Sequence, residues 1–172
     1  IDENGNLIWE KELLSDNQSI EVIYSIALSP DGYYYLCSGS NSISSPEIFY
    51  PTIFKIDGSG NIDWKRDLNA NGREYHQFRA IATQLGEIIV VGSSSQNLPM
   101  GYKEDAFMTK LDSRGQIIWS YPYGSYDEDD WGWTVFETPE SNLFFVGSTK
   151  SFGASLFDVY LVGTNSKGIS KT

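Results

Sequence analysis

Three runs of consecutive apolar residues dominate the pattern of this chain. They are YYYLCSG at residues 33–39, EIIVVG at residues 87–92 and NLFFVG at residues 142–147. A strand with one solvent-exposed face alternates apolar and polar residues. These runs stay apolar on successive positions, as in strands that are covered on both faces. No stretch keeps a 3.6-residue period, so the pattern predicts an all-β protein with almost no helix.

A motif of the form D-x-x-G-x-x-x-W recurs every 55 residues along the chain. Its members are Asp2, Asp57 and Asp112, then Gly5, Gly60 and Gly115, then Trp9, Trp64 and Trp119. Asn165 and Gly168 restart the motif a fourth time, two residues early. Such long periods are typical of solenoids, propellers and arrays. We therefore predict a single region of three units, at approximately 1–57, 58–112 and 113–168.

Each unit is predicted to contain four short strands. In the middle unit these are residues 61–68, 76–83, 87–95 and 105–112. The D-x-x-G segments suit tight turns, because Asp binds its own downstream backbone and Gly takes a positive φ. At the other end of each unit we expect longer connecting loops, at residues 41–51, 94–105 and 149–157.

Antiparallel four-stranded sheets, each packed between its neighbours, are the blades of a β-propeller. The recurring tryptophans would then lie between their own outer strand and the next blade. A ring needs about four to eight blades, so three cannot close one. The prediction is a β-propeller of about three four-stranded blades, either a partial propeller or half of a six-bladed dimer.

Charge and composition narrow the possible partners. Among the 172 residues, 12 are basic and 23 acidic, for a net charge of −11. This charge disfavours nucleic acid and anionic membrane surfaces, and no apolar run is long enough for membrane insertion. Cys37 is the only cysteine, so no intrachain disulfide can form, and His76 is the only histidine. High glycine and aromatic content with few lysines favours a secreted protein.

The densest candidate chemistry is YDEDDWGW at residues 126–133. Asp127, Asp129 and Asp130 offer the oxygen ligands that Ca²⁺ prefers, although the spacing is not that of an EF-hand. The alternative is a solvated acidic loop.

The candidate ligand contacts are Tyr126 and Trp131 of this loop, together with His76, which shares the repeat column of Trp131. Trp131 shares its column of the repeat with polar residues, so we expect it to be exposed, as a carbohydrate platform would be. Trp133 aligns with Phe78 and Ile23 and is expected in the core. Cys37 is expected to be a small buried residue rather than a nucleophile.

The third unit also contains short sequence motifs known from a protein family. They are Tyr123-Gly124, Asp129-Asp130, Gly147-Ser148-Thr149, Ser151-Phe152-Gly153 and Asp158-Val159-Tyr160-Leu161. With them the chain resembles the β-propeller repeats of secreted and cell-surface bacterial and archaeal proteins. The D-x-x-G-x-x-x-W element is more distantly similar to quinoprotein-like propeller repeats. The resemblance implies a propeller fold and an extracellular or cell-surface location.

The function that fits best is a non-catalytic extracellular scaffold, adhesion or binding module. It would need no cofactor beyond a possible structural Ca²⁺. Its partners would be other copies of itself, neighbouring blades of a longer chain, or protein or glycan ligands. Two alternatives stay open: a propeller enzyme or carbohydrate-binding domain that acts on extracellular polysaccharide, and a purely structural self-assembling repeat.

Overall fold

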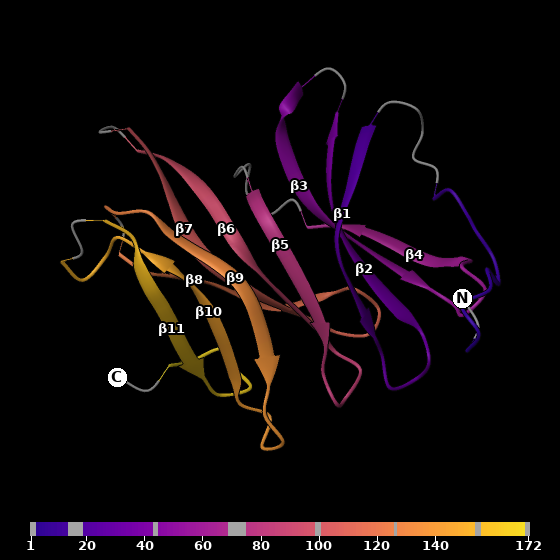
Figure 1. The fold of residues 1–172 in the computed structure, drawn as a ribbon. Helices are drawn as coiled ribbons and strands as arrows, with labels where there is room; N and C mark the ends of the chain where they lie inside the picture. The colour runs from indigo at the N-terminus through magenta and orange to yellow at the C-terminus, as the bar shows by residue number, and fades with distance from the viewer. Residues whose placement is uncertain are drawn as a thin grey trace.

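The fold consists of antiparallel sheets that follow one another along the chain (Figure 1). The computed structural model describes residues 3–13, 19–42, 45–68, 75–98, 101–125, 127–153 and 156–170. Within these ranges the structure has eleven strands in three sheets of four, four and three strands, and no helix. Nothing in the described ranges is therefore a helix that could cross a membrane.

Strand order in every sheet follows the sequence. The N-terminal sheet contains β1 (Ser19–Leu28), β2 (Tyr34–Ser42), β3 (Ser45–Ile56) and β4 (Ile62–Asp67). The middle sheet contains β5 (Tyr75–Ala82), β6 (Ile88–Leu98), β7 (Gly101–Leu111) and β8 (Ile117–Tyr123). The C-terminal sheet contains β9 (Asp130–Glu137), β10 (Leu143–Thr149) and β11 (Asp158–Thr164).

Two of the expected loops are strands. Residues 41–51 and 94–105 were predicted as longer connections, but β2, β3, β6 and β7 run through most of these ranges. The β6–β7 ladder continues without interruption from Ile88↔Leu111 to Leu98↔Gly101. The serine-rich segment after Gly92 lies in this ladder, and Ser93, Ser94 and Ser95 are buried. The polar side chains of this segment suggested a loop. In the structure its backbone N–H and C=O groups are paired in the long β6–β7 hairpin.

The repeated aspartates build the turns between the third and fourth strands. Asp57 accepts hydrogen bonds at Oδ1 from the backbone N–H groups of Ser59 and Asn61, both at 2.8 Å. Asp112 does the same for Arg114 and Gln116, at 2.9 and 2.8 Å. Asn165 does so for Lys167 and Ile169. The carboxylate or amide oxygen replaces a backbone acceptor, which is the turn chemistry that Asp and Asn favour.

Each repeated tryptophan closes onto the turn of the next sheet. Trp9 donates its Nε1–H to the carbonyl of Gly58 at 3.0 Å, and Trp64 donates to Ser113 at 3.3 Å. The ring lies over the turn glycine: a Cβ built on Gly60 would stand 2.9 Å from Trp9, and one on Gly115 3.0 Å from Trp64. Trp119 lies over Gly168 in the same way. We call this contact the tryptophan clasp.

The clasp confirms part of the expectation for these residues. The tryptophans do contact the following sheet, but they lie at its edge and remain accessible: Trp64 and Trp119 are half-buried and Trp9 is exposed. Asp2 lies outside the described residues.

Two hydrophobic layers fill the space between successive sheets. The first contains Tyr35, Cys37 and Ile53 of the N-terminal sheet with Ile88 and Val90 of the middle sheet. The second joins the opposite face of the middle sheet to the C-terminal sheet; its members include Ile89, Val91, Met108, Leu143 and Phe145. The middle sheet is therefore covered on both faces, as its unbroken apolar runs predict. The first strands β1, β5 and β9 lie side by side (Figure 1).

Candidate functional site

The acidic loop between β8 and β9 is held to its neighbours by ion pairs. Asp129 Oδ2 lies 2.8 Å from Lys150 Nζ and 3.9 Å from Lys103 Nζ. Asp129 Oδ1 accepts the backbone N–H of Glu104 at 3.3 Å. Burial tends to raise the pKa of Asp129, but the hydrogen bonds from Lys150 and Glu104 and the charges of both lysines outweigh it and lower the pKa. Asp129 therefore ties β9 to β7 and to the end of β10.

Asp130 is fully buried among hydroxyl groups. Its Oδ2 accepts a hydrogen bond from Ser151 Oγ at 2.6 Å and from the backbone N–H of Ser125 at 3.1 Å. The Thr149 hydroxyl donates to Oδ1. Gly124 borders this site at φ +120°, and a Cβ there would stand 1.9 Å from Asp130 Oδ2. Only glycine leaves room for the carboxylate, which explains the glycine of the Tyr123-Gly124 motif in the third unit.

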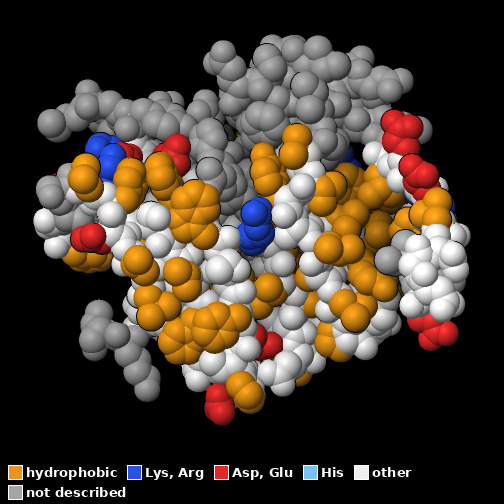
Figure 2. Space-filling view, in the orientation of Figure 1, with side chains coloured by type: hydrophobic (Ala, Val, Ile, Leu, Met, Phe, Trp, Pro, Cys, Tyr) orange, Lys and Arg blue, Asp and Glu red, His pale blue; other side chains and the backbone are white. Residues whose placement is uncertain are grey.

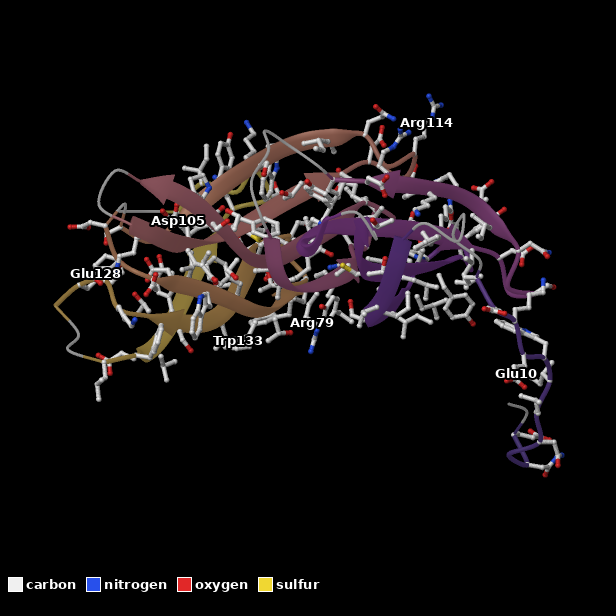
Figure 3. The ribbon with its side chains drawn as sticks, turned by 90° about the horizontal axis from the view of Figure 1, so that it is seen from above. Glu10, Arg79, Asp105, Arg114, Glu128 and Trp133 are labelled. Carbon is white, nitrogen blue, oxygen red and sulfur yellow. The ribbon has the colours of Figure 1, made fainter. Side chains whose placement is uncertain are left out.

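The loop does not gather its carboxylates around a common point. Asp129 faces two lysines and Asp130 faces hydroxyl donors, while Asp127 is exposed. Glu128, labelled in Figure 3, pairs with Lys103 at 3.6 Å. Among the described residues no group of three His, Cys, Asp or Glu side chains could hold a metal ion. The described part of the loop thus offers Ca²⁺ no shared ligand set, and protein donors occupy Asp129 and Asp130, two of the three carboxylates that were predicted to bind it.

Trp131 is half-buried and packed against a neighbouring ring, so the expectation of an exposed platform at this residue is wrong. Its ring stacks on Phe157 with centroids 4.3 Å apart and planes 25° apart. Lys150 Nζ lies 4.4 Å from the centroid of the Phe157 ring and also donates a hydrogen bond to Asp129 Oδ2. The Trp131 Nε1 atom is buried and has no hydrogen-bond partner.

Trp133 is the more exposed of the two tryptophans, with 39% of its surface accessible, and the expectation that it lies in the core is also wrong. Its Nε1–H donates to Ser148 Oγ at 2.9 Å, and its ring meets Trp131 edge to face at 5.9 Å. Figure 3 shows Trp133 on the same side of the molecule as Arg79.

A bulge explains why the repeat column misplaced these two tryptophans. In the β9–β10 ladder Thr134 pairs with Val146 and Gly132 with Gly147, so Trp133 is the extra residue. A bulge breaks the period of two and turns its side chain away from the regular face. The β1–β2 ladder has a bulge at the equivalent place, where Tyr24 is the extra residue. Column alignment of the sequence cannot show this shift.

Two of the predicted ligand contacts, Tyr126 and His76, stay predictions. Tyr126 lies outside the described residues. The backbone of His76 pairs with Ser93 in the middle sheet, and its side chain is outside the described part. Cys37 is buried, and desolvation raises the pKa of its thiol to about 12. It is therefore the inert small residue that the sequence predicted.

Two buried lysines escaped the sequence analysis although the repeat carries them. Lys55 pairs with Asp31 at 3.1 Å and Lys110 with Glu87 at 2.5 Å. The two lysines are 55 residues apart and lie opposite Trp64 and Trp119 in the neighbouring strand. The same 55-residue comparison that identified the tryptophans could have identified them. Each lysine thus joins the third strand of its sheet to the turn between the first and second strands of the same sheet.

The outer face of the C-terminal sheet, called the C-terminal face below, is apolar and exposed. It is formed by Phe136, Phe144, Val146, Val159 and Leu161. Phe136 and Phe144 stack at 5.4 Å across the β9–β10 pair. Leu161 is 63% exposed.

The outer face of the N-terminal sheet, the N-terminal face, is also apolar. It contains Ile26, Tyr34, Leu36, Phe54 and Ile56. Leu36, Phe54 and Ile56 are buried, with Leu13 of the N-terminal segment packed against them, so Ile26 and Tyr34 are the accessible members of this face. Ile26 is 62% exposed and lines a hollow of about 290 Å³ together with Ile8 and Trp9. Figure 2 shows hydrophobic side chains gathered over both outer sheets.

Comparison of the chain with protein-family models and with curated proteins finds no match.

Proposed function

We propose that the three sheets are consecutive blades of a β-propeller that serves as a non-catalytic scaffold and binding module outside the cell or on its surface. The observation that supports it best is the repeated relation between sheets. Each sheet stacks on the next, the first strands lie side by side, and the tryptophan of one unit closes on the turn of the next. Blades of a propeller repeat in this way around an axis.

A binding role is favoured over catalysis by the use of the charged residues. The buried carboxylate of Asp130 is fixed by hydroxyl donors, and Asp129 is neutralised by lysines. A glycosidase needs two carboxyl groups that face one substrate bond across a gap. The buried charges described here instead join one strand or loop to another.

The test is a comparison of turnover and binding on extracellular polysaccharides. We expect saturable binding of a glycan or protein ligand without release of reducing ends. The Asp130→Asn variant is the control for catalysis. Hydrolysis by the wild type that this folded variant loses would overturn the proposal in favour of an enzyme.

Glycan is the ligand class with a specific structural observation behind it. Trp133 and Phe157 are each 39% exposed at the loop end of the C-terminal sheet, and amphipathic rings of this kind stack on sugar faces. We expect Trp133→Ala to weaken glycan binding about tenfold or more, the cost of about 1.4 kcal/mol of lost contact. Trp9→Ala, an equally exposed tryptophan at the other end of the chain, should leave binding unchanged. Equal losses in the two variants would contradict a site at Trp133.

A further inference from the structure

We propose that the C-terminal face binds the N-terminal face of a second copy of this chain, head to tail. This inference rests on the proposed function, because it takes the sheets to be blades. It goes further by naming the partner of two surfaces and the direction in which they meet.

The C-terminal face repeats a surface that is already an interface within the chain. In its own sheet, β10 has the same position and pairing as β6 has in the middle sheet, and β11 has the same position as β7. Each residue of the C-terminal face therefore has an equivalent in the middle sheet. Those equivalents are Ile81, Ile89, Val91, Ala106 and Met108. All five pack in the layer that the C-terminal sheet covers, and the last four have no exposed surface. The C-terminal face therefore has the chemistry of a face that receives another sheet.

The N-terminal face repeats the other side of the same interface. Strand pairing aligns Ile26, Tyr34 and Leu36 with Ala80, Ile88 and Val90. These three residues lie in the layer that the N-terminal sheet covers. The middle sheet thus presents both kinds of face, one to each neighbour. A contact between the C-terminal face of one copy and the N-terminal face of another would repeat the contact that joins neighbouring sheets within the chain. A contact between two identical faces would not repeat it.

The N-terminal segment marks the direction of this contact. Trp9 lies on the turn of the N-terminal sheet as Trp64 lies on the turn of the middle sheet. Trp64 belongs to the fourth strand of the preceding sheet, and Trp9 has the equivalent position in a segment whose described residues, 3–13, belong to no sheet. Figure 3 shows this segment, labelled at Glu10, projecting from the sheets. A preceding sheet supplied by another copy would lie beside it.

A head-to-tail contact uses two different surfaces of each copy. It closes into a ring when the rotation between copies allows it, and otherwise forms an open filament. If the sheets within the chain and between copies are related by the same rotation, two copies give six blades, a number within the range of known propellers.

The test uses the full chain and two variants that each spoil one face. Leu161→Asp places a carboxylate on the C-terminal face and Ile26→Asp places one on the N-terminal face. Both residues are more than half exposed, so the monomer should fold as the wild type does, as judged by circular dichroism. Leu85→Asp is the matched control, because Leu85 is 77% exposed at a turn of the middle sheet and belongs to neither face.

Sedimentation equilibrium should show self-association of the wild type and of Leu85→Asp. Each face variant alone should associate at least about tenfold more weakly, because a carboxylate would be buried in an apolar contact. Mixing the two variants should restore 1:1 pairs, since each retains the face that the other has lost.

Two results would overturn the inference. A wild type that stays monomeric at all concentrations would show that the faces do not take a second copy. Association that Ile26→Asp leaves intact would show that like faces meet. Both results leave the glycan and turnover measurements unaffected, so failure of this inference is distinguishable from failure of the proposed function.

Discussion

At the scale of single residues, backbone conformation limits this chain as strongly as hydrophobicity does. Gly60, Gly115 and Gly168 have positive φ and also lie beneath a tryptophan ring. Gly32 and Gly86 have positive φ in the other set of turns, with open space or a single side-chain oxygen nearby. The two sets of glycines therefore separate the cost of conformation from the cost of contact.

Gly115→Ala should destabilise the protein more than Gly32→Ala. The second substitution brings only the left-handed backbone penalty of about 1–2 kcal/mol. The first adds the displacement of Trp64, an overpacking cost of about 1–3 kcal/mol. Urea unfolding of both variants measures the difference. Equal losses of stability would show that the ring moves aside freely and that the clasp contributes little.

Ser141→Gly should stabilise the protein. Ser141 has φ +62° at the turn position that Gly32 and Gly86 occupy in the other two units. Removing its Cβ relieves the left-handed strain, and the flexibility of glycine in the unfolded chain offsets part of the gain, leaving about 0.5–1 kcal/mol. Thermal unfolding measures the gain, with Gly86→Ser as the reciprocal control. A lower melting temperature for Ser141→Gly would contradict this explanation.

Cys37 should make the protein sensitive to alkali. Its pKa is raised from about 9 to about 12 by burial, so above pH 9 the unfolded thiol loses its proton while the folded one keeps it. The contribution of Cys37 to stability is therefore fully present below pH 9 and is lost as the pH rises toward 12. Cys37→Val, the residue found at the equivalent Val91 and Val146, should flatten this decrease. Tyr35, Tyr123 and Tyr160 also have raised pKa values in both proteins, so the difference between the variants reports Cys37. Parallel stability curves from pH 9 to 11 would contradict burial of the thiol.

At the scale of elements, the sequence predicted the strands but not which sheet each one joins, nor where the strands stop or bulge. Residues 61–68, expected as the first strand of the middle unit, contain β4, the last strand of the N-terminal sheet. The 55-residue motif identified the turns, because Asp and Gly at fixed spacing have direct backbone consequences. It placed Trp131 and Trp133 on the wrong sides, because a bulge at Trp133 changes the face without changing the spacing. The acidic loop was visible in the sequence, but its partners Lys103 and Lys150 come from other elements.

Trp64→Ala should cost far more stability than Trp9→Ala, although both residues make the clasp. Trp64 also packs against the first hydrophobic layer beside Tyr35, at 6.0 Å between ring centroids. Its truncation should cost about 2–4 kcal/mol, toward the lower end of the range for a large aromatic residue because the ring is only half-buried. Trp9 is exposed, so its loss should cost about 1 kcal/mol or less. Chemical denaturation distinguishes the two. A similar cost for both would mean that the clasp, rather than the hydrophobic layer, carries the stability.

At the scale of the whole molecule, the apolar outer faces and the net charge act against each other. Covering a face removes apolar surface from water, which favours association. Two copies each carrying a charge of −11 repel one another, and salt screens this repulsion over a distance of about 8–10 Å at physiological ionic strength. The balance between the two effects should therefore depend on salt in a direction that identifies the contact.

Sodium chloride should strengthen self-association. If the contact joins the C-terminal and N-terminal faces, it contains few charged groups, so screening removes repulsion and leaves the apolar attraction intact. Raising the salt from low to physiological concentration should lower the dissociation constant, measured by sedimentation at each ionic strength. The Leu85→Asp control carries one more negative charge outside both faces and should show the same trend. Dissociation on adding salt would require opposite charges to hold the copies together, and the contact would then involve the lysines and carboxylates of the loop end rather than the apolar faces.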